Sequence, residues 1–262
     1  YLTLEDVLRV ARGGEGAELD TSVLEQMRAA REVVEQARAE GREVYGLTTG
    51  VGARKRFRPG DEAAAFNRRM LLDHRVGSGP TVADDVARAA VLLTANHLAA
   101  GWAGARPELG RALAAALDGP APSIRLYGSI GMGDVAPRAD LAHGALGDLP
   151  LAAGEALALI SSNAFSTALA ALALADAGRL LDTLDVAGAL DLEAFAGSVA
   201  PLDPAAAAAR PDPGAVSTAE RLRALLEGSY LLDEGAARNL QDPLSFRCLP
   251  QVHGAARDAL AY

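Results

Sequence analysis

Two glycine-rich segments contain the residue types and spacings best suited to chemistry. In Tyr45-Gly46-Leu47-Thr48-Thr49-Gly50-Val51-Gly52, a phenol precedes three glycines, which give the backbone freedom to approach a ligand closely. Tyrosine ionises at a pH of about 10 in water, so Tyr45 needs neighbouring cations or oriented dipoles to act as a base. An isolated tyrosine before a glycine turn is usually structural. The second segment, Gly128-Ser129-Ile130-Gly131-Met132-Gly133-Asp134, also contains three glycines.

Three further segments contain polar residues in positions suited to binding. His74 lies just before a run of glycines, and Ser161, Ser162 and Asn163 interrupt a long apolar stretch, where polar side chains need partners or a pocket. The serines can equally bond to carbonyls one helical turn back. The segment from Gln241 to Gly254 contains Arg247, whose guanidinium can hold a carboxylate through two parallel hydrogen bonds.

Metal and nucleotide sites are not expected. Asp140 and His143 share a spacing of three, but no third ligand accompanies them, and His74, His97 and His253 lie too far apart in sequence to complete a site. The single cysteine, Cys248, excludes a disulfide within the chain. The glycines at 128, 131 and 133 have neither the dinucleotide-binding spacing nor a following lysine.

Composition limits the class of protein. The chain has 262 residues, half of them hydrophobic, and a net charge of −9, which argues against a nucleic-acid partner. Its one basic cluster, Arg54 to Arg58, is typical of a solvated loop. Polar residues interrupt the segment from Leu151 to Ala177 before about 18 apolar residues accumulate, so no membrane span is expected. No signal-peptide pattern opens the sequence, and a cytoplasmic location is predicted.

Helical periodicity dominates the chain and predicts a mainly α fold. Short strands are predicted at Glu43–Leu47 and Ile124–Ile130, and irregular backbone at Tyr45–Gly60 and Tyr127–Pro150. We expect residues 1–150 to form a loop-rich helical region and residues 151–262 to begin a region of long helices. Helices are expected from Thr3 to Val10, from a capping box at Ser22 to Gly41, from Thr81 to Ala100, from Pro107 to Leu117, from Leu151 to Leu184 as one buried helix, from Thr218 to Leu226 and from near Pro250.

These segments resemble those of the aromatic amino acid ammonia-lyase and aminomutase family, whose type member is histidine ammonia-lyase. The segment Gln241 to Gly254 resembles the family's Gln-Asp-x-Tyr-Ser-x-Arg-Cys-x-Pro-Gln-Val-x-Gly almost throughout. The glycine loop after Tyr45 resembles Tyr-Gly-Val-Asn-Thr-Gly-Phe-Gly, and the segment around His74 resembles Leu-Ser-His-Ala-x-Gly-x-Gly-x-Pro. The resemblance extends over essentially the whole chain and implies the family's all-helical fold.

The resemblance also implies roles for single residues. It makes Tyr45 the group that takes the substrate's β-proton and Arg247 the anchor of its α-carboxylate. His74, Asn163 and Gln241 would contact the substrate. The family's catalytic loop reads Gly-Ser-Val-Gly-Ala-Ser-Gly-Asp-Leu-Ala-Pro, and its Ala-Ser-Gly cyclises and dehydrates to an electrophilic methylidene-imidazolone. The corresponding residues here are Gly131, Met132 and Gly133.

Three departures from the family fall on positions that serve this prosthetic group. The loop is one residue shorter, and Met132 stands where the family has Ala-Ser. Because methionine has no β-leaving group, no methylidene can form from it, and we expect no such group. Ser161 replaces an Asn that contacts the group, and Leu244 replaces a Tyr of the catalytic set.

The sequence therefore predicts a lyase, addition or isomerisation enzyme that acts without the prosthetic group on a carboxylate or amino-acid-like substrate. Family members continue for roughly as many residues again, through a second helical half. One alternative is accordingly a non-catalytic or half-site subunit that assembles with a separate C-terminal half, or with itself as a homo-oligomer. The other alternative is a conventional ammonia-lyase.

Overall fold

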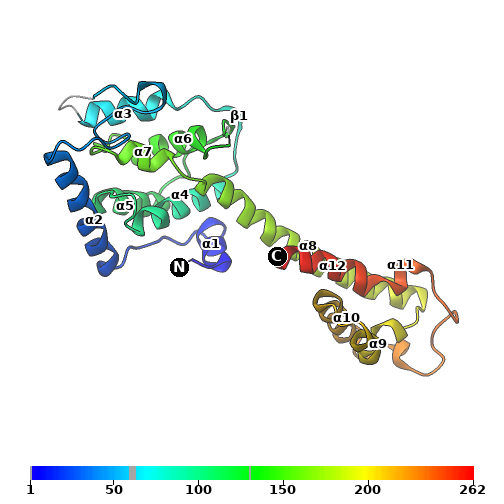
Figure 1. The fold of residues 1–262 in the computed structure, drawn as a ribbon. Helices are drawn as coiled ribbons and strands as arrows, with labels where there is room; N and C mark the ends of the chain where they lie inside the picture. Colours follow the sequence, from blue (N-terminus) through cyan, green and yellow to red (C-terminus); the bar gives the residue numbers. More distant parts are fainter. Residues whose placement is uncertain (1, 59–62, 130) are drawn as a thin grey trace. The chain divides into compact units, whose positions relative to one another are not determined.

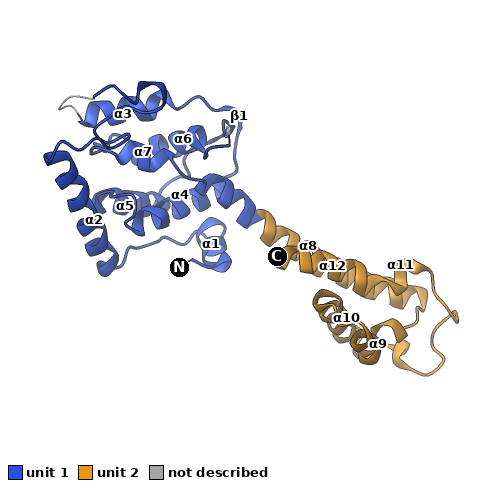
Figure 2. Cartoon of the chain, in the orientation of Figure 1, with its two compact units in different colours: residues 1–172 blue, residues 173–262 orange. Residues whose placement is uncertain are grey.

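The computed structural model describes residues 2–58, 63–129 and 131–262, which form two compact units, 1–172 and 173–262 (Figures 1 and 2). Both units are built from helices, which confirms the predicted mainly α fold. The sequence-based boundary between residues 150 and 151 lies inside unit 1.

Unit 1 is organised around α4, which contacts α1, α2, α5 and α6, while α3, α6 and α7 pack on one another (Figure 1). A small antiparallel sheet pairs Ser78 of β1 with Tyr127 of β2 and Thr81 with Arg125. The core consists of side chains such as Met27, Leu98 and Leu109, which have no exposed surface. The elements of unit 1 are α1 (Leu4–Ala11), α2 (Thr21–Ala39), η1 (Gly52–Arg54), α3 (Ala63–Asp73), β1 (Ser78–Thr81), α4 (Asp84–Ala99), α5 (Pro107–Ala115), η2 (Ala116–Asp118), β2 (Arg125–Tyr127), α6 (Val135–Leu146), α7 (Glu155–Ile160) and the start of α8 (Ala164–Phe195).

Local capping signals set several helix ends. The helix predicted from Thr3 is α1, and Thr3 and Asp6 form a reciprocal capping box at its start. The predicted box at Ser22 is wrong, because the Asp20 side chain caps α2 by accepting from the Ser22 N–H at 2.8 Å. An ionised carboxylate is the stronger acceptor at a helix N-terminus.

The predicted single helix from Leu151 to Leu184 is also wrong. The chain forms α7, breaks at residues 161–163 and resumes as α8, which continues to Phe195. Short polar side chains compete with the helical backbone, and here the break also provides partners for another segment. The Ser162 carbonyl accepts from the Asp134 N–H at 3.0 Å, and the Asp134 carboxylate accepts from the Ser166 N–H at 2.8 Å.

Other boundaries differ from the predictions. Residues 43–47 form turns rather than a strand, and in the second predicted strand only Arg125–Tyr127 is extended, with Ile130 outside the described residues. The predicted irregular zone Tyr127–Pro150 contains α6. The helix expected from Thr81 begins at Asp84, because Thr81 pairs in the sheet. The helix expected from Thr218 begins earlier, at Pro213.

Unit 2 packs α10 against α12 at very short range. A Cβ placed on Gly214 would lie 2.1 Å from the Gly254 carbonyl oxygen, so glycine is required for this approach. Leu192, Leu222 and Leu226 form the centre of a small apolar core. Besides the remainder of α8, unit 2 contains η3 (Ala200–Leu202), α9 (Pro204–Ala209), α10 (Pro213–Leu225), η4 (Tyr230–Leu232), α11 (Leu244–Arg247) and α12 (Leu249–Ala261).

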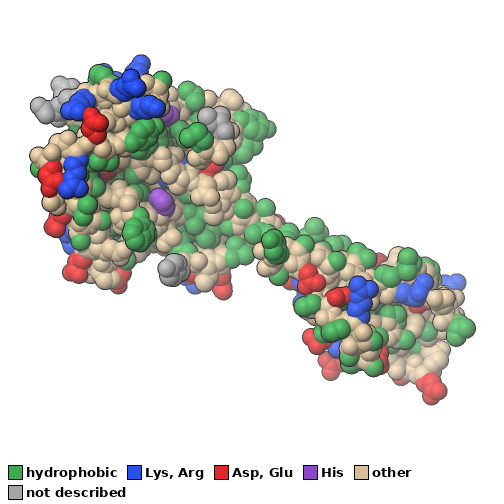
Figure 3. Space-filling view, in the orientation of Figure 1, with side chains coloured by type: hydrophobic (Ala, Val, Ile, Leu, Met, Phe, Trp, Pro, Cys, Tyr) green, Lys and Arg blue, Asp and Glu red, His purple; other side chains and the backbone are tan. Residues whose placement is uncertain are grey.

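The segment Glu155–Phe195 is long and apolar enough to cross a membrane by length and composition alone, with a mean hydropathy of 1.7. Core helices of water-soluble proteins share this composition, and Ile160, Phe165 and Leu172 lie in the core of unit 1. Further along α8, Leu174, Leu180 and Leu190 are exposed, so the predicted all-round burial is wrong there. Figure 3 shows hydrophobic side chains at the surface along this helix. The absence of a membrane span stays a prediction.

Candidate active site

Tyr45 lies in a tight turn that rests on α7. The Val44 carbonyl accepts from the N–H groups of Leu47 and Thr48, and Gly46 adopts a positive φ of 71°. A Cβ on Gly46 would fall 2.2 Å from a methyl group of Leu157, so only glycine allows this close packing. The Tyr45 side chain is 53% exposed, and its oxygen accepts from the Gly52 N–H at 2.7 Å.

This turn forms one wall of a cavity of about 730 Å³ inside unit 1. Most of the remaining wall is apolar, from residues of α2, α7 and the segment 101–104. Tyr45, His97, Trp102 and Ser161 are the lining residues with polar side-chain groups, and among the described residues no acidic residue, lysine or arginine lines the cavity. An apolar cavity of this size with a few polar groups is typical of a small-molecule site.

The Gly131-Met132-Gly133 loop is tied to the break between α7 and α8. Asp134 is 3% exposed and links the loop to this break through the bonds to Ser162 and Ser166 described above. The Ser129 hydroxyl donates to the Gly133 carbonyl at 3.2 Å, whereas the Met132 side chain is 91% exposed.

These residues do not fit the methylidene-imidazolone group that the family resemblance implies. Its exocyclic carbon requires a side chain that loses water, and the exposed thioether of Met132 has no such leaving group. Ser129 lies outside the three residues and already donates to Gly133. No chemical step is therefore derived through the group.

A buried arginine lies behind the cavity. Arg138 has no exposed surface; its Nε donates to the Leu159 carbonyl at 2.5 Å and its Nη1 to the Thr94 hydroxyl at 3.1 Å. Its Nη2 has no partner among the described residues. Burial lowers the pKa of Arg138 to about 10, against the opposing effect of Asp134.

Burial and the nearby Arg138 also shift the pKa of His97, which lines the cavity. Burial lowers the pKa of His97 below its ordinary value, and the Arg138 cation lowers it further. A lowered folded pKa means that the unfolded chain binds the proton more readily, so the stability that neutral His97 contributes is lost as pH falls below about 6.5.

We expect His97→Gln to reduce the acid sensitivity of the fold. Urea midpoints at pH 7.0 and 5.5 should lie closer together in the variant than in the wild type, because glutamine does not titrate. An unchanged difference between the two midpoints would show that His97 does not contribute to the acid sensitivity.

His74 lies at the end of α3 and does not line this cavity. Its Nδ1 is 2.7 Å from the Met70 carbonyl oxygen. Because a carbonyl only accepts, Nδ1 is the donor in this hydrogen bond. Asn163 is exposed in the helix break.

The other predicted substrate-binding residues belong to unit 2. Arg247 is partly buried at the end of α11, and its Nε donates to the Asp242 carbonyl at 2.8 Å. Its Nη1 and Nη2 have no hydrogen-bond partner among the described residues, so they can take a carboxylate. Gln241 is exposed, and Leu244 is 63% exposed.

The structure thus brings Tyr45 and Ser161 into one cavity and the Gly131–Gly133 loop into contact with the adjoining helix break. Sequence reasoning considered His97 only as a metal ligand and missed its place in the cavity. A lone histidine near the end of a helix gives no local signal for such a role. Among the described residues, no group of three or more His, Cys, Asp or Glu side chains is arranged to hold a metal ion.

Known proteins with related sequences are histidine ammonia-lyases. The enzyme of Sorangium cellulosum (strain So ce56) is 38% identical over 291 residues, covering 100% of this chain and 57% of the relative. The enzyme of Streptococcus pyogenes serotype M5 is 36% identical over 288 residues, and the match covers 100% of this chain and 56% of that relative. The chain therefore spans little more than half the length of these relatives.

Solved structures of an ergothionase and a tyrosine aminomutase have the same fold as this chain. Ergothionase from Treponema denticola superposes with a TM-score of 0.93 at 31% identity, over 100% of this chain and 57% of that one. Tyrosine aminomutase from Streptomyces globisporus gives 0.90 at 28% identity, over 99% and 58%. The family model for aromatic amino acid lyase matches residues 2–150 and 141–262. The chain belongs to the aromatic amino acid lyase family.

Proposed function

We propose that this chain acts on a small carboxylate or amino-acid-like substrate without a methylidene-imidazolone group, with Tyr45 as acid and base and Arg247 as carboxylate anchor. The observation that carries the proposal is the position of the Tyr45 hydroxyl. It lies at the wall of the apolar cavity and accepts from the Gly52 N–H at 2.7 Å, while its own proton has no acceptor among the described residues. A backbone dipole aimed at an oxygen stabilises negative charge there.

The chemistry open to such a site is limited by what Tyr45 can deprotonate. Without an electrophilic group on the protein, the carbon–hydrogen bond must be activated by the substrate itself, for example by an adjacent carbonyl. Tyr45 then takes the proton from that carbon and returns it to the same or a neighbouring position. Ser161, Trp102 and neutral His97 provide further polar contacts in the cavity. Arg247 would hold the carboxylate through its two Nη nitrogens.

Mass spectrometry tests the missing group directly. We expect the denatured chain to have the full mass of its sequence, because Gly131, Met132 and Gly133 cannot form the dehydrated ring. A deficit of two water molecules would show that a group of this kind has formed and would overturn the proposal.

A substrate assay on the same protein separates the enzymatic alternatives. In D₂O, we expect deuterium to enter C3 of phenylpyruvate, whose protons are activated by the neighbouring carbonyl, faster than in buffer alone. L-Histidine and L-phenylalanine should release no ammonia. Formation of urocanate from L-histidine would identify a conventional ammonia-lyase.

A second candidate is assembly as a subunit, which the exposed leucines of α8 favour. Leu180 is 59% exposed and Leu190 is 61% exposed on α8, and apolar surface of this kind normally marks an interface. A second copy of the chain or a separate C-terminal half would cover it. Native mass spectra of the same sample distinguish the two partners. A homo-oligomer would support self-association, whereas a monomer would support assembly with a separate C-terminal half.

A further inference from the structure

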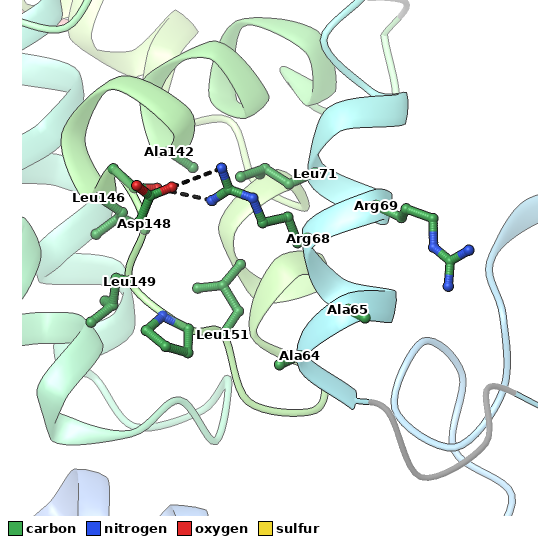
Figure 4. A pocket seen from close by; sticks show the side chains of 12 residues that line it. Ala64, Ala65, Arg68, Arg69, Leu71, Ala142, Leu146, Asp148, Leu149 and Leu151 are labelled. Atoms are coloured by element: carbon green, nitrogen blue, oxygen red, sulfur yellow. Dashed lines mark hydrogen bonds and ion pairs between the residues drawn. The ribbon is translucent and has the colours of Figure 1, made fainter.

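A second pocket of unit 1 lies between α3, α6 and residues 147–151, which follow α6. It has a volume of about 570 Å³ and shares no lining residue with the Tyr45 cavity. Its walls are aliphatic, with Leu71, Leu146 and Leu151 as the largest buried side chains (Figure 4). No aromatic ring lines it, and its only charged lining residues are Arg68, Arg69 and Asp148.

The pocket lies where the two stretches matched by the family model overlap. These stretches, residues 2–150 and 141–262, share residues 141–150, which include the turn that lines the pocket. The match to the Sorangium enzyme extends over 291 residues, against the 262 of this chain. Here Gly147, at φ 53°, ends α6, and the chain passes directly into Leu149 and Leu151.

The guanidinium of Arg68 extends from α3 to the residues that follow α6, on the opposite wall of this pocket. Arg68 of α3 donates from Nη1 to the Gly147 carbonyl at 3.1 Å and from Nη2 to the Asp148 carboxylate at 3.0 Å, whereas Arg69 points away (Figure 4). The Asp148 side chain is 97% exposed. Such a surface ion pair contributes little to stability, so a carboxylate that also buries an apolar tail can replace Asp148 at Arg68.

We propose that this pocket binds an aliphatic monocarboxylate, with the tail among the leucines and the carboxylate on Arg68. The volume is within the usual range for small-molecule pockets, and the wall offers apolar contact rather than the hydrogen-bonding groups that a sugar or a nucleotide needs. The charge of Arg68 matches a carboxylate and excludes an ammonium group.

Calorimetric titration with octanoate tests the site, with octanamide as an uncharged probe of nearly the same shape. We expect octanamide to bind about tenfold more weakly, because it loses the charge-assisted bonds to Arg68. Arg68→Gln should weaken octanoate binding by a similar factor, and Arg69→Gln, the matched control, should change it by less than about twofold. Asp148→Asn should tighten binding about threefold, because it removes the competing carboxylate.

Three results would overturn this site: no binding of octanoate, equal affinity for octanoate and octanamide, or equal effects of the Arg68 and Arg69 substitutions. Tyr45→Phe should leave octanoate affinity unchanged, since Tyr45 lines a different cavity. A loss of octanoate affinity in Tyr45→Phe would place the ligand in that cavity and would also overturn the proposal. The test is independent of the reaction proposed for Tyr45.

Discussion

Replacement of Asp185 by alanine should lower the free energy of unfolding by about 3 kcal/mol, because it removes a buried carboxylate that two arginines and a histidine share. The Asp185 side chain, on α8, has no exposed surface. It accepts from His253 Nδ1 at 2.8 Å, lies 3.2 Å from Arg221 Nε and also forms an ion pair with Arg257. These contacts connect α8 to α10 and α12, so the loss affects the whole of unit 2. Urea denaturation of the full chain, followed by circular dichroism, measures the change.

Asp182 provides the matched control one helical turn earlier. Its side chain is 49% exposed and pairs with Arg257 at 2.9 Å. An exposed pair of this kind is worth up to about 1 kcal/mol, so Asp182→Ala should have the smaller effect. Equal losses from the two substitutions would mean that burial of Asp185 does not determine its contribution.

The helix ends that depend on neighbours in sequence could be predicted. The capping box of Thr3 and Asp6 and the proline at the start of α5 are complete local signals, and both helices begin where expected. At α2 the sequence predicts a capping box at Ser22, whereas the Asp20 carboxylate caps the helix.

The break between α7 and α8 could not be predicted, because its partner lies far away in sequence. Apolar residues on both sides of Ser161 fit one continuous helix, and the interruption is stabilised by Asp134, nearly thirty residues earlier. The same limit applies to the candidate site. Motifs identified Tyr45 and Ser161 one by one, but only the folded chain shows that His97 joins them in a cavity.

The pocket at Arg68 had no sequence signal at all. Its walls are alanines, leucines and a proline, which are ordinary residues for a helical core. What distinguishes the place is the overlap of the two stretches matched by the family model, and that becomes visible only in comparison with relatives.

Tyr45→Phe should reduce deuterium exchange at C3 of phenylpyruvate by at least about 100-fold, the usual contribution of a positioned acid or base. The substitution removes one oxygen and preserves the ring, so packing at the cavity wall changes little. The Gly52 N–H, which donates to that oxygen at 2.7 Å, lies in an exposed turn and can bond to water instead. We therefore expect the urea midpoint to change little while exchange is lost.

Tyr127→Phe is the control, because Tyr127 lies in β2 of the same unit, is 59% exposed and does not line the Tyr45 cavity. It should retain the wild-type exchange rate. If Tyr45→Phe also retained that rate, another group would have to move the proton. His97 would then be the candidate, as the other titratable side chain of the cavity, and His97→Gln would be expected to lose exchange instead. The lowered pKa of His97 keeps its imidazole neutral at pH 7, the form in which it can accept a proton.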